Sequence, residues 1–449
     1  MNKDTICALA TPPGGALGII RVSGSKTFAI VSTICSVCCD SVTGNTVHYT
    51  HIVDSDGEPV DETLVSVFRA PHSYTGEDSV EISCHGSSYI LNKILELLVN
   101  KGCRIANPGE FTMRAYLNGK MDLSQAEAVA DLIASTNRAT HHIAMSQLRG
   151  GISTKLSQLR EKLLKLNTLL ELELDFSDHE DLEFADRKEL FSLAQTIEAH
   201  INHLAHSFET GQALKHGIPV AIVGKTNVGK STLLNALLHD DRAIVSDIHG
   251  TTRDTIEDTI DIHGVMFRFI DTAGIRQTND KVEQIGIQRT YQAIEHARIV
   301  LWLFDSTPTT NEAAEIISHT QGRSLIPILT KADLRPACCK SIEGFDTISI
   351  SAKTGQGIPA LEQAIFAAAD IPNLSETDVI ITNARHYDAL RRAHASIRRV
   401  IDGLQVQLSG DLLAEDLRDV LAILSEITGT QITPQETLNN IFSHFCVGK

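Results

Sequence analysis

The hydrophobic pattern changes along the chain and predicts three kinds of structure. Residues 1–118 contain short apolar runs between glycines and prolines, such as LGIIRVSG and SVEISCHG, which are typical of strands in a small α+β domain. From residue 124 to residue 206 apolar side chains recur at three- and four-residue steps, most clearly over 152–170, which predicts helices. Strand-type runs alternate with helical spacing over 217–371, as in α/β domains, and a helical pattern returns at 383–445.

The two helical regions flank the α/β region and are predicted to form one discontinuous domain. Each flank alone would leave its apolar face uncovered, whereas the two together can bury it. Two separate helical domains remain the alternative. The predicted fold is therefore multidomain, with an N-terminal α+β domain at 1–118, a helical domain at 119–214 and 372–449, and an inserted α/β P-loop domain at 217–371.

A glycine-rich turn, GKTNVGKS at 224–231, lies between an apolar strand-type run and the helix-type segment KSTLLNALL. In that position backbone N–H groups and the N-terminus of the helix can surround phosphate oxygens. Lys230 can offer a positive charge to the β and γ phosphates, and Ser231 can ligate Mg²⁺. A glycine-rich turn that binds nothing is the alternative, but the motifs that follow favour a nucleotide site.

Further motifs follow in the order that a Ras-like guanine-nucleotide switch requires: GTTRD at 250–254, DTAG at 271–274, TKAD at 330–333 and SAK at 351–353. An aspartate at position 333 can accept hydrogen bonds from N1–H and N2–H of guanine, which adenine does not present, so the predicted nucleotide is GTP rather than ATP. Where GTPases usually have Asn, the chain has Thr330, which leaves the affinity for the base open. The predicted nucleotide-binding residues are Asn227, Val228, Gly229, Lys230, Ser231, Thr232, Ser246, Asp247, Ile248, His249, Gly250, Thr251, Thr252, Asp271, Thr272, Ala273, Gly274, Thr330, Lys331, Asp333, Ser351, Ala352 and Lys353.

The residue that follows DTAG is Ile275, at the place where Ras-type GTPases have the glutamine that orients the attacking water. An aliphatic side chain cannot position water, so hydrolysis must use another polar group. The nearby candidates are Arg253, Arg276, Asp280 and Glu283. Each is either catalytic or a solvated charge on a surface loop.

Composition agrees with a soluble, cytoplasmic protein. No apolar stretch reaches the roughly 18 residues that a membrane span requires. Asp4 and Pro12 interrupt the N-terminal region, so no signal peptide is expected. Nine cysteines without a disulfide framework suit a reducing compartment. Cys35, Cys38 and Cys39 lack a second pair at zinc-site spacing, so we interpret them as structural or incidental.

The formal net charge of −17 argues against nonspecific binding of nucleic acid, because Lys and Arg contacts to phosphate dominate such binding. A local basic segment exists nonetheless in the helix predicted at 384–400. Its charged side is either an RNA contact or a solvated, salt-bridged face. The arginines concerned are Arg385, Arg391, Arg392, Arg398 and Arg399.

Other candidate site residues lie near the two ends of the chain. Arg21, Glu81, His85 and Lys120 lie near predicted strand or loop ends, where ligand contacts are common, but their spacing does not show that they converge. Cys446, near the C-terminus, is either a buried thiol or a reactive one.

Several motifs together resemble the tRNA modification GTPases of the MnmE (TrmE) family over essentially the whole chain. Besides the GTPase motifs, the resemblance rests on ATPPGG at 10–15, IIRVSG at 19–24, SYTGED at 73–78, the segment from NPGEF to ADLI at 107–133, and the terminal FCVGK. A GTPase domain alone would fit many families. The flanking motifs make the resemblance specific.

The resemblance implies a function for each domain. Members of this family act as homodimers with the FAD protein MnmG, in a heterotetramer. They install an aminomethyl or carboxymethylaminomethyl group at C5 of the wobble uridine (U34) of certain tRNAs, using 5-formyltetrahydrofolate or another one-carbon tetrahydrofolate. The N-terminal domain resembles folate-binding aminomethyltransferase domains and forms the dimer. Arg21, Glu81, Lys120 and Lys449 fall where the family binds the folate, and Cys446 matches a tail cysteine considered catalytic.

For the GTPase domain the resemblance implies two metal ions and a catalytic pair. The K⁺ ligands would be Asn227, Ser246, Ile248 and Thr251, and the Mg²⁺ ligands Ser231 and Thr252. Glu283 matches the family's water-orienting glutamate and would act with Lys230 in catalysis. The chain departs from the family pattern at Thr226, which replaces a proline, and at Thr330.

Two other functional classes compete with tRNA modification. A ribosome- or RNA-assembly GTPase would share the GTPase motifs and modify nothing, but would be expected to carry an RNA-binding module in place of the folate-type N-terminal block and FCVGK. A membrane-remodelling GTPase would need an amphipathic basic anchor, which the sequence lacks. The flanks therefore favour modification.

Overall fold

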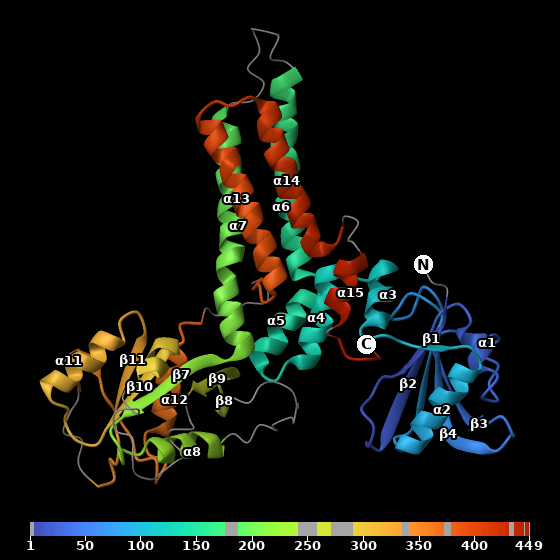
Figure 1. Cartoon of the computed structure of the whole chain (residues 1–449), viewed down its shortest axis with the longest axis horizontal. Helices are drawn as coiled ribbons and strands as arrows, with labels where there is room; N and C mark the ends of the chain where they lie inside the picture. The colour runs from blue at the N-terminus through green and yellow to red at the C-terminus, as the bar shows by residue number, and fades with distance from the viewer. Residues whose placement is uncertain are drawn as a thin grey trace. The chain divides into compact units, whose positions relative to one another are not determined.

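The fold is described from a computed structural model, in which residues 4–175, 187–240, 258–270, 291–334, 341–342, 344–371, 379–430, 435–443 and 445–448 are described (Figure 1). The chain divides into two compact units. Unit 1 comprises Met1–Ala134, Gln147–Glu198 and Arg392–Lys449, and unit 2 comprises Ser135–Ser146 and Ala199–Arg391. The three domain boundaries expected from the sequence stay predictions.

The N-terminal part of unit 1 is a six-stranded sheet in the order β3-β4-β5-β2-β1-β6. On β2, Ile20 and Val22 are buried, whereas Arg21 between them lies on the opposite face. The buried side chains pack with those of α2, such as Leu91 and Ile94. The elements are β1 (Ile6–Leu9), β2 (Leu17–Ser23), α1 (Thr27–Val31), β3 (Thr46–Val53), β4 (Pro59–Phe68), β5 (Ser79–His85), α2 (Ser88–Asn100) and β6 (Arg104–Ile105).

The other elements described in unit 1 are helices. The stripe predicted over 152–170 is confirmed, because Leu156, Leu159, Leu163, Leu166 and Leu170 are buried along one helix. In Figure 1 this helix, α6, runs beside α14. The helices are α3 (Glu110–Leu117), α4 (Leu123–Ala134), α6 (Gly151–Asp175), α14 (Gly410–Thr428) and α15 (Gln435–Ser443), whereas α5 (Arg138–Leu148), α7 (Arg187–His216) and α13 (Ala384–Gln405) belong partly to each unit.

Unit 2 contains a second six-stranded sheet, in the order β14-β11-β10-β7-β9-β8. All of its neighbouring strands pair in parallel except β8, which is antiparallel to β9. Every residue of β10, IVLWLF, is buried, as expected of a central strand covered on both faces. The elements are β7 (Ile218–Gly224), α8 (Lys230–Asp240), β8 (Asp258–Ile262), β9 (Val265–Ile270), β10 (Ile299–Phe304), α11 (Thr310–His319), β11 (Ser324–Leu329), β12 (Ser341–Ile342), β13 (Phe345–Asp346), β14 (Ile348–Ser349) and α12 (Ile358–Ala368).

The parallel strands of unit 2 determine where a ligand site can lie. In an open α/β sheet, ligands bind outside the carboxyl ends of the strands, and β7, β10, β11 and β14 all end at the same edge. The turns after β7, β11 and β14 carry the predicted nucleotide motifs. Among the helices of the described residues, none is long and apolar enough to cross a membrane.

Candidate functional site

The phosphate loop joins β7 to α8. At Gly224 the backbone approaches the neighbouring strand closely, because a Cβ placed there would lie 2.4 Å from the carbonyl oxygen of Leu303. Farther along the loop Asn227 and Gly229 have φ values of 63° and 102°, in the left-handed region. These values turn the backbone sharply before the helix begins at Lys230. The loop therefore has the strand-turn-helix context that its sequence predicted.

Lys230 folds back along this loop. Its Nζ donates a hydrogen bond to the carbonyl oxygen of Gly224 at 2.6 Å. Burial lowers the pKa of the ammonium group, because desolvation disfavours the charged form. A bound phosphate would favour the charged form again. Ser231 and Thr232 follow in the first turn of α8 and are exposed, at the helix end where backbone N–H groups and the dipole favour an anion.

The segment that follows β11 lies next to the phosphate loop. The hydroxyl of Thr330 donates to the carbonyl oxygen of Val228 at 2.7 Å, so TKAD and the loop are in direct contact. Asp333 is exposed, as a residue that reads a base must be. The turn after β14 is joined to the same segment, since the N–H of Ala332 donates to the carbonyl oxygen of Ile350 at 3.0 Å. Ser351 is buried beside it.

The structure thus brings together the described part of the predicted nucleotide site, from Asn227 to Thr232, from Thr330 to Asp333 and from Ser351 to Lys353. The rest of the predicted site lies outside the described residues, namely Ser246, Asp247, Ile248, His249, Gly250, Thr251, Thr252, Asp271, Thr272, Ala273 and Gly274. Glu283 and its alternatives Arg253, Arg276 and Asp280 lie outside them too. Their roles stay predictions.

A second candidate site lies on the N-terminal sheet around Arg21. Arg21 on β2 pairs with Glu81 on β5 across the strands, with Nε–Oε1 and Nη2–Oε1 distances of 2.9 and 2.8 Å. The guanidinium carbon lies 5.2 Å from the ring centre of Tyr74 and 5.6 Å from that of Phe111. Two aromatic rings and a carboxylate therefore hold this arginine in one orientation.

The C-terminal tail reaches the same arginine. Nη1 of Arg21 donates to the carbonyl oxygen of Gly448 at 3.2 Å. Gly448 has a φ of 95°, and a Cβ at this position would lie 2.3 Å from the carbonyl oxygen of Leu9, so the tail runs against β1. Cys446 is exposed. Lys449, the next residue after Gly448, lies outside the described residues, but its neighbour is in contact with Arg21.

Lys120 and His85 have other partners. Nζ of Lys120 donates to the carbonyl oxygen of Pro71 at 2.9 Å, in the loop that also carries Tyr74. Nδ1 of His85 lies 2.7 Å from Oδ1 of Asp61. The structure therefore joins Arg21, Glu81 and the tail directly. Among the described residues, Lys120 contacts the loop after β4, which also carries Tyr74.

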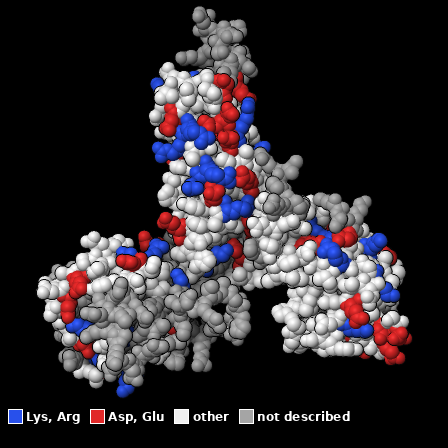
Figure 2. All heavy atoms as spheres, viewed as in Figure 1, with Lys and Arg blue, Asp and Glu red and all other residues white. Residues whose placement is uncertain are grey.

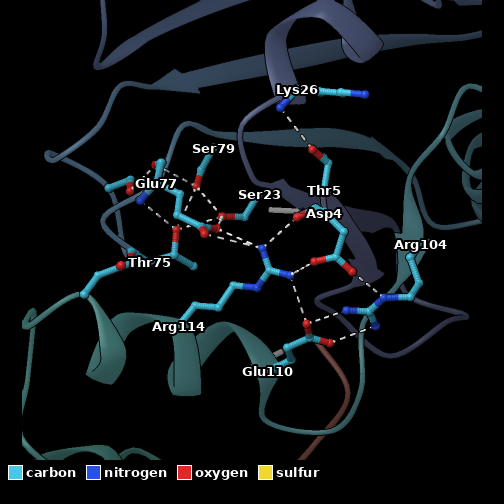
Figure 3. Close-up of polar contacts among 12 residues, drawn as sticks. Asp4, Thr5, Ser23, Lys26, Thr75, Glu77, Ser79, Arg104, Glu110 and Arg114 are labelled. Atoms are coloured by element: carbon cyan, nitrogen blue, oxygen red, sulfur yellow. Dashed lines mark hydrogen bonds and ion pairs between the residues drawn. The ribbon is translucent and has the colours of Figure 1, made fainter. Parts of the chain in front are cut away.

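Sequence reasoning missed a buried charged network beside this site (Figure 3). Arg114 on α3 lies at its centre, with ion pairs to Asp4 at 2.8 Å, Glu110 at 3.0 Å and Glu77 at 3.2 Å. Arg104 pairs with Glu110 at 2.6 Å and with Asp4 at 2.7 Å. The one signal in the sequence was the i,i+4 spacing of Glu110 and Arg114 within NPGEFTMRA.

The network should stabilise the N-terminal sheet above about pH 4.5. Burial raises the pKa of Glu110, but hydrogen bonds from Arg104, Asn107 and Arg114 outweigh it, and the net pKa is lowered from 4.5. The pKa of Asp4 is lowered in the same way by the two arginines. A lowered pKa in the folded state means that the stabilisation is present above the unfolded pKa and is lost as the pH falls through the folded one.

An Arg114→Ala substitution should lower the local free energy of unfolding by about 2 kcal/mol at pH 7, because it removes charge-assisted hydrogen bonds to Asp4, Glu77 and Glu110, while Arg104 still pairs with Asp4 and Glu110. Hydrogen–deuterium exchange of peptides that cover β1 and α3 measures the change, with Lys93→Ala as control, since Lys93 forms a long i,i+3 pair at 3.7 Å with the exposed Glu96. The difference from the native protein should shrink as the pH falls through the lowered folded-state pKa values of Glu110 and Asp4, because the carboxylates then become protonated. Equal exchange in both variants at pH 7 would show that the network contributes nothing.

The arginine-rich helix α13 carries ion pairs. Arg392 pairs with Glu426 at 2.6 Å, Arg399 with Asp416 at 2.7 Å, and Arg391 with Asp388 at 3.5 Å. In Figure 2 basic and acidic side chains are interspersed along the helices of unit 1. The structure favours the salt-bridged face over an RNA contact for these three arginines, which are exposed, as Arg398 is.

Comparisons with known proteins cover the full length of the chain. A domain family described as "MnmE helical domain" matches residues 123–446, and one described as "GTP-binding protein TrmE N-terminus" matches residues 5–120. A protein of Phocaeicola vulgatus called "tRNA modification GTPase MnmE" is 52% identical over 497 residues, with 100% of this chain and 99% of that protein covered. One of Flavobacterium johnsoniae with the same name is 48% identical over 468 residues, with 100% of each covered.

Among solved structures, the G domain of the T. maritima FeoB iron transporter is 23% identical, covers 34% of this chain and 99% of that one, and has a TM-score of 0.26, which is too low to carry an argument. The full-length relatives determine the family of this chain. They confirm the predicted multidomain fold class and disfavour an assembly GTPase that modifies nothing. The chain therefore belongs to the MnmE (TrmE) family and is a GTP hydrolase that acts in tRNA modification.

Proposed function

We propose that the chain is a K⁺-dependent GTPase that works with the FAD protein MnmG to install an aminomethyl or carboxymethylaminomethyl group at C5 of the wobble uridine of certain tRNAs. The one-carbon unit would come from a tetrahydrofolate. The observation that carries this proposal is the presence of two sites of different chemistry in one chain. Unit 2 has a phosphate loop with a half-buried lysine, and unit 1 has an arginine–carboxylate pair beside the C-terminal tail.

The residues of unit 2 suit GTP. The loop backbone and the N-terminus of α8 would bind the phosphates, Lys230 would balance their charge, and Asp333 would accept hydrogen bonds from guanine. Ser231 and Thr252 would hold Mg²⁺, which when bound neutralises charge on the phosphate oxygens. Glu283 would orient the attacking water, in place of the glutamine that Ras-type GTPases use.

The position and chemistry of the Asn227 side chain suit a ligand of K⁺. It is exposed on the phosphate loop, and its amide oxygen is a neutral donor of the kind that hard cations accept. Asn227, Ser246, Ile248 and Thr251 would hold K⁺, which when bound adds a positive charge where other GTPases insert an arginine. In a homodimer the G domains of two copies would close on GTP and reopen after hydrolysis, and this motion would organise the folate and flavin chemistry.

The native protein should hydrolyse GTP about tenfold faster or more in KCl than in NaCl at equal ionic strength, since a fixed charge at the transition state has an effect of at least this size. Asn227→Ala should lose the stimulation. Asn235→Ala, which changes an exposed asparagine on α8, should retain it. Equal native rates in the two salts would show that K⁺ is not needed for hydrolysis. Arg253 and Arg276 would then again be candidate catalytic residues.

The Arg21 site suits a folate. Glu81 is a carboxylate that can accept hydrogen bonds from the adjacent N–H and NH₂ groups of a pterin, and Arg21, Lys120 and Lys449 are cations that can bind carboxylates or polarise a carbonyl. Tyr74 and Phe111 hold Arg21 in position. When bound, the folate would supply the one-carbon unit. Cys446 is exposed on the tail beside this site.

Arg21→Met should weaken binding of 5-formyltetrahydrofolate about 10- to 100-fold, because a hydrogen bond to a charged group contributes about 1.5–3 kcal/mol. Isothermal titration calorimetry measures the dissociation constant. Arg399→Met is the control, since it breaks an arginine–carboxylate pair of similar length on α13. Unchanged affinity in Arg21→Met would place the folate elsewhere.

MnmG, tRNA and a second copy of the chain are the proposed partners, and the cytoplasm is the proposed location. The family assignment supports a role on tRNA. FAD would be bound by MnmG rather than by this chain.

A further inference from the structure

Three cysteines lie in the connection between α1 and β3, at positions 35, 38 and 39. Cys35 and Cys39 are buried, with 7% and 0% of their surfaces exposed, whereas Cys38 is exposed. Sγ of Cys35 lies 3.5 Å from the carbonyl oxygen of Val37, and Sγ of Cys39 lies 3.8 Å from the same oxygen. The two buried thiols also form a hydrogen bond with each other. An exposed thiol is therefore the chain neighbour of two buried thiols in contact.

The backbone around these thiols is held by the neighbouring strands. Cys35 forms an isolated bridge with Ile52 on β3, and both side chains belong to the hydrophobic core of the N-terminal sheet. Just after β4, the guanidinium of Arg69 donates to the carbonyl oxygens of Cys39 at 3.1 Å and Asp40 at 2.8 Å. The fold thus keeps the two buried sulfurs together, which raises the effective concentration of each thiol toward the other.

The hydrogen bond makes the two buried thiols chemically different. It lowers the pKa of Cys39, to which the side chain of Ser32 also contributes, and together with burial it raises the pKa of Cys35. Cys35 therefore donates its S–H to a Cys39 sulfur that has thiolate character. A thiolate beside a second thiol is the arrangement in which oxidation ends in a disulfide. Among the described residues, the three cysteines do not form a group that could hold a metal ion.

We propose that this cluster is a reversible thiol–disulfide exchange site for low-molecular-weight disulfides such as glutathione disulfide. Cys38 receives the oxidising equivalent from solution, and the buried pair stores it as a disulfide between Cys35 and Cys39. The inference goes beyond the proposed function and depends on neither the GTP site nor the folate site. Disulfides in a reducing compartment are usually transient and redox-sensing, so this one should form when the ratio of disulfide to thiol rises.

The exchange takes three steps. Cys38 attacks glutathione disulfide, which leaves a mixed disulfide on Cys38 and releases one glutathione that takes up the Cys38 proton. Cys35, at the C-x-x-C spacing of redox motifs, then attacks the Cys38 sulfur, passes its proton to Cys39 and releases the second glutathione as a thiolate. Cys39 finally attacks the Cys35 sulfur and returns its proton to the departing Cys38. The buried pair loses two electrons, and one glutathione disulfide becomes two molecules of glutathione.

The test incubates the full-length protein with glutathione disulfide and then blocks free thiols with N-ethylmaleimide in denaturant. Disulfides are next reduced and the released thiols labelled with iodoacetamide, and fragmentation of the peptide that covers 35–39 assigns each label by mass spectrometry. We expect iodoacetamide on Cys35 and Cys39 and N-ethylmaleimide on Cys38. Cys84 on β5 is the control, because this buried thiol has its pKa raised to about 11 by burial and should stay reduced.

Two variants separate the roles of the thiols. Cys38→Ser should form the buried disulfide at least about tenfold more slowly, because exchange rates depend on access and the exposed thiol is missing. Cys35→Ala should keep glutathione on Cys38, because the thiol that displaces it is missing. If circular dichroism shows that Cys35→Ala does not fold, Cys39→Ala takes its place, and the disulfide should then join Cys35 to Cys38.

Three results would overturn the inference. In the native protein, glutathione that stays on Cys38 would show that the buried pair does not displace it. N-ethylmaleimide on all three cysteines would show that the cluster does not react with the disulfide. A Cys35–Cys39 disulfide that forms at the native rate in Cys38→Ser would show that the exposed thiol is not the point of entry.

Discussion

Lys230→Met should reduce the rate of GTP hydrolysis about 100- to 1000-fold, the loss expected when one fixed group that stabilises transition-state charge is removed. The ammonium of Lys230 lies against the carbonyl oxygen of Gly224, inside the curve of the phosphate loop. Methionine keeps the length of the side chain and removes the charge. The effect should therefore appear mainly in kcat, which steady-state phosphate release measures.

Lys225, in the same loop, provides a control that distinguishes the catalytic role of Lys230 from a general effect of removing a positive charge. Lys225 is 78% exposed and pairs with Glu312 on α11 at 2.5 Å. Lys225→Met should retain native hydrolysis within about threefold, since an exposed pair contributes little. Native activity in Lys230→Met, or an equal loss in both variants, would contradict the assignment of Lys230.

Asp333→Asn should change the preferred base from guanine to xanthine. The carboxylate accepts from N1–H and N2–H of guanine, whereas an asparagine amide can donate to the O2 oxygen that xanthine has in place of the amino group. A site built around a hydrogen bond rejects the unmatched analogue strongly, so the ratio of affinities for GDP and XDP should shift by roughly 100-fold or more. Competition against a fluorescent nucleotide measures both constants.

Asp346→Asn is the control for this change, because Asp346 is an exposed aspartate of the same unit, on β13. It should leave the preference for GDP intact. If Asp333→Asn kept the native preference as well, the base would be read by a different residue, and the interpretation of TKAD would be wrong.

The elements with strong local patterns were predictable from the sequence. The leucine stripe of α6 has the helical period over its whole length, and the parallel strand β10 is a continuous apolar run. The phosphate loop was predictable because its function requires a fixed set of residues within one turn between a strand and a helix. Each of these signals lies within a short stretch of chain.

Contacts between distant residues had no such signal. The hydroxyl of Thr330 reaches Val228 across 102 positions, and Arg21 reaches Gly448 across 427. Only the sheet register and the path of the tail bring these partners together. The Arg114 network was missed for the same reason, because Asp4 and Arg114 are 110 positions apart. A sequence pattern identifies residues suited to a site, but tertiary packing determines which of them meet.

We propose that GTP hydrolysis by this chain drives modification of the wobble uridine. The most direct measurement combines the protein with MnmG, tRNA, GTP, K⁺ and a one-carbon tetrahydrofolate, and detects the modified nucleoside by mass spectrometry. We expect a product that requires GTP and the folate, and that is lost with either Lys230→Met or Arg21→Met. A product that forms at the same rate without GTP, or equally well with Lys230→Met, would contradict it.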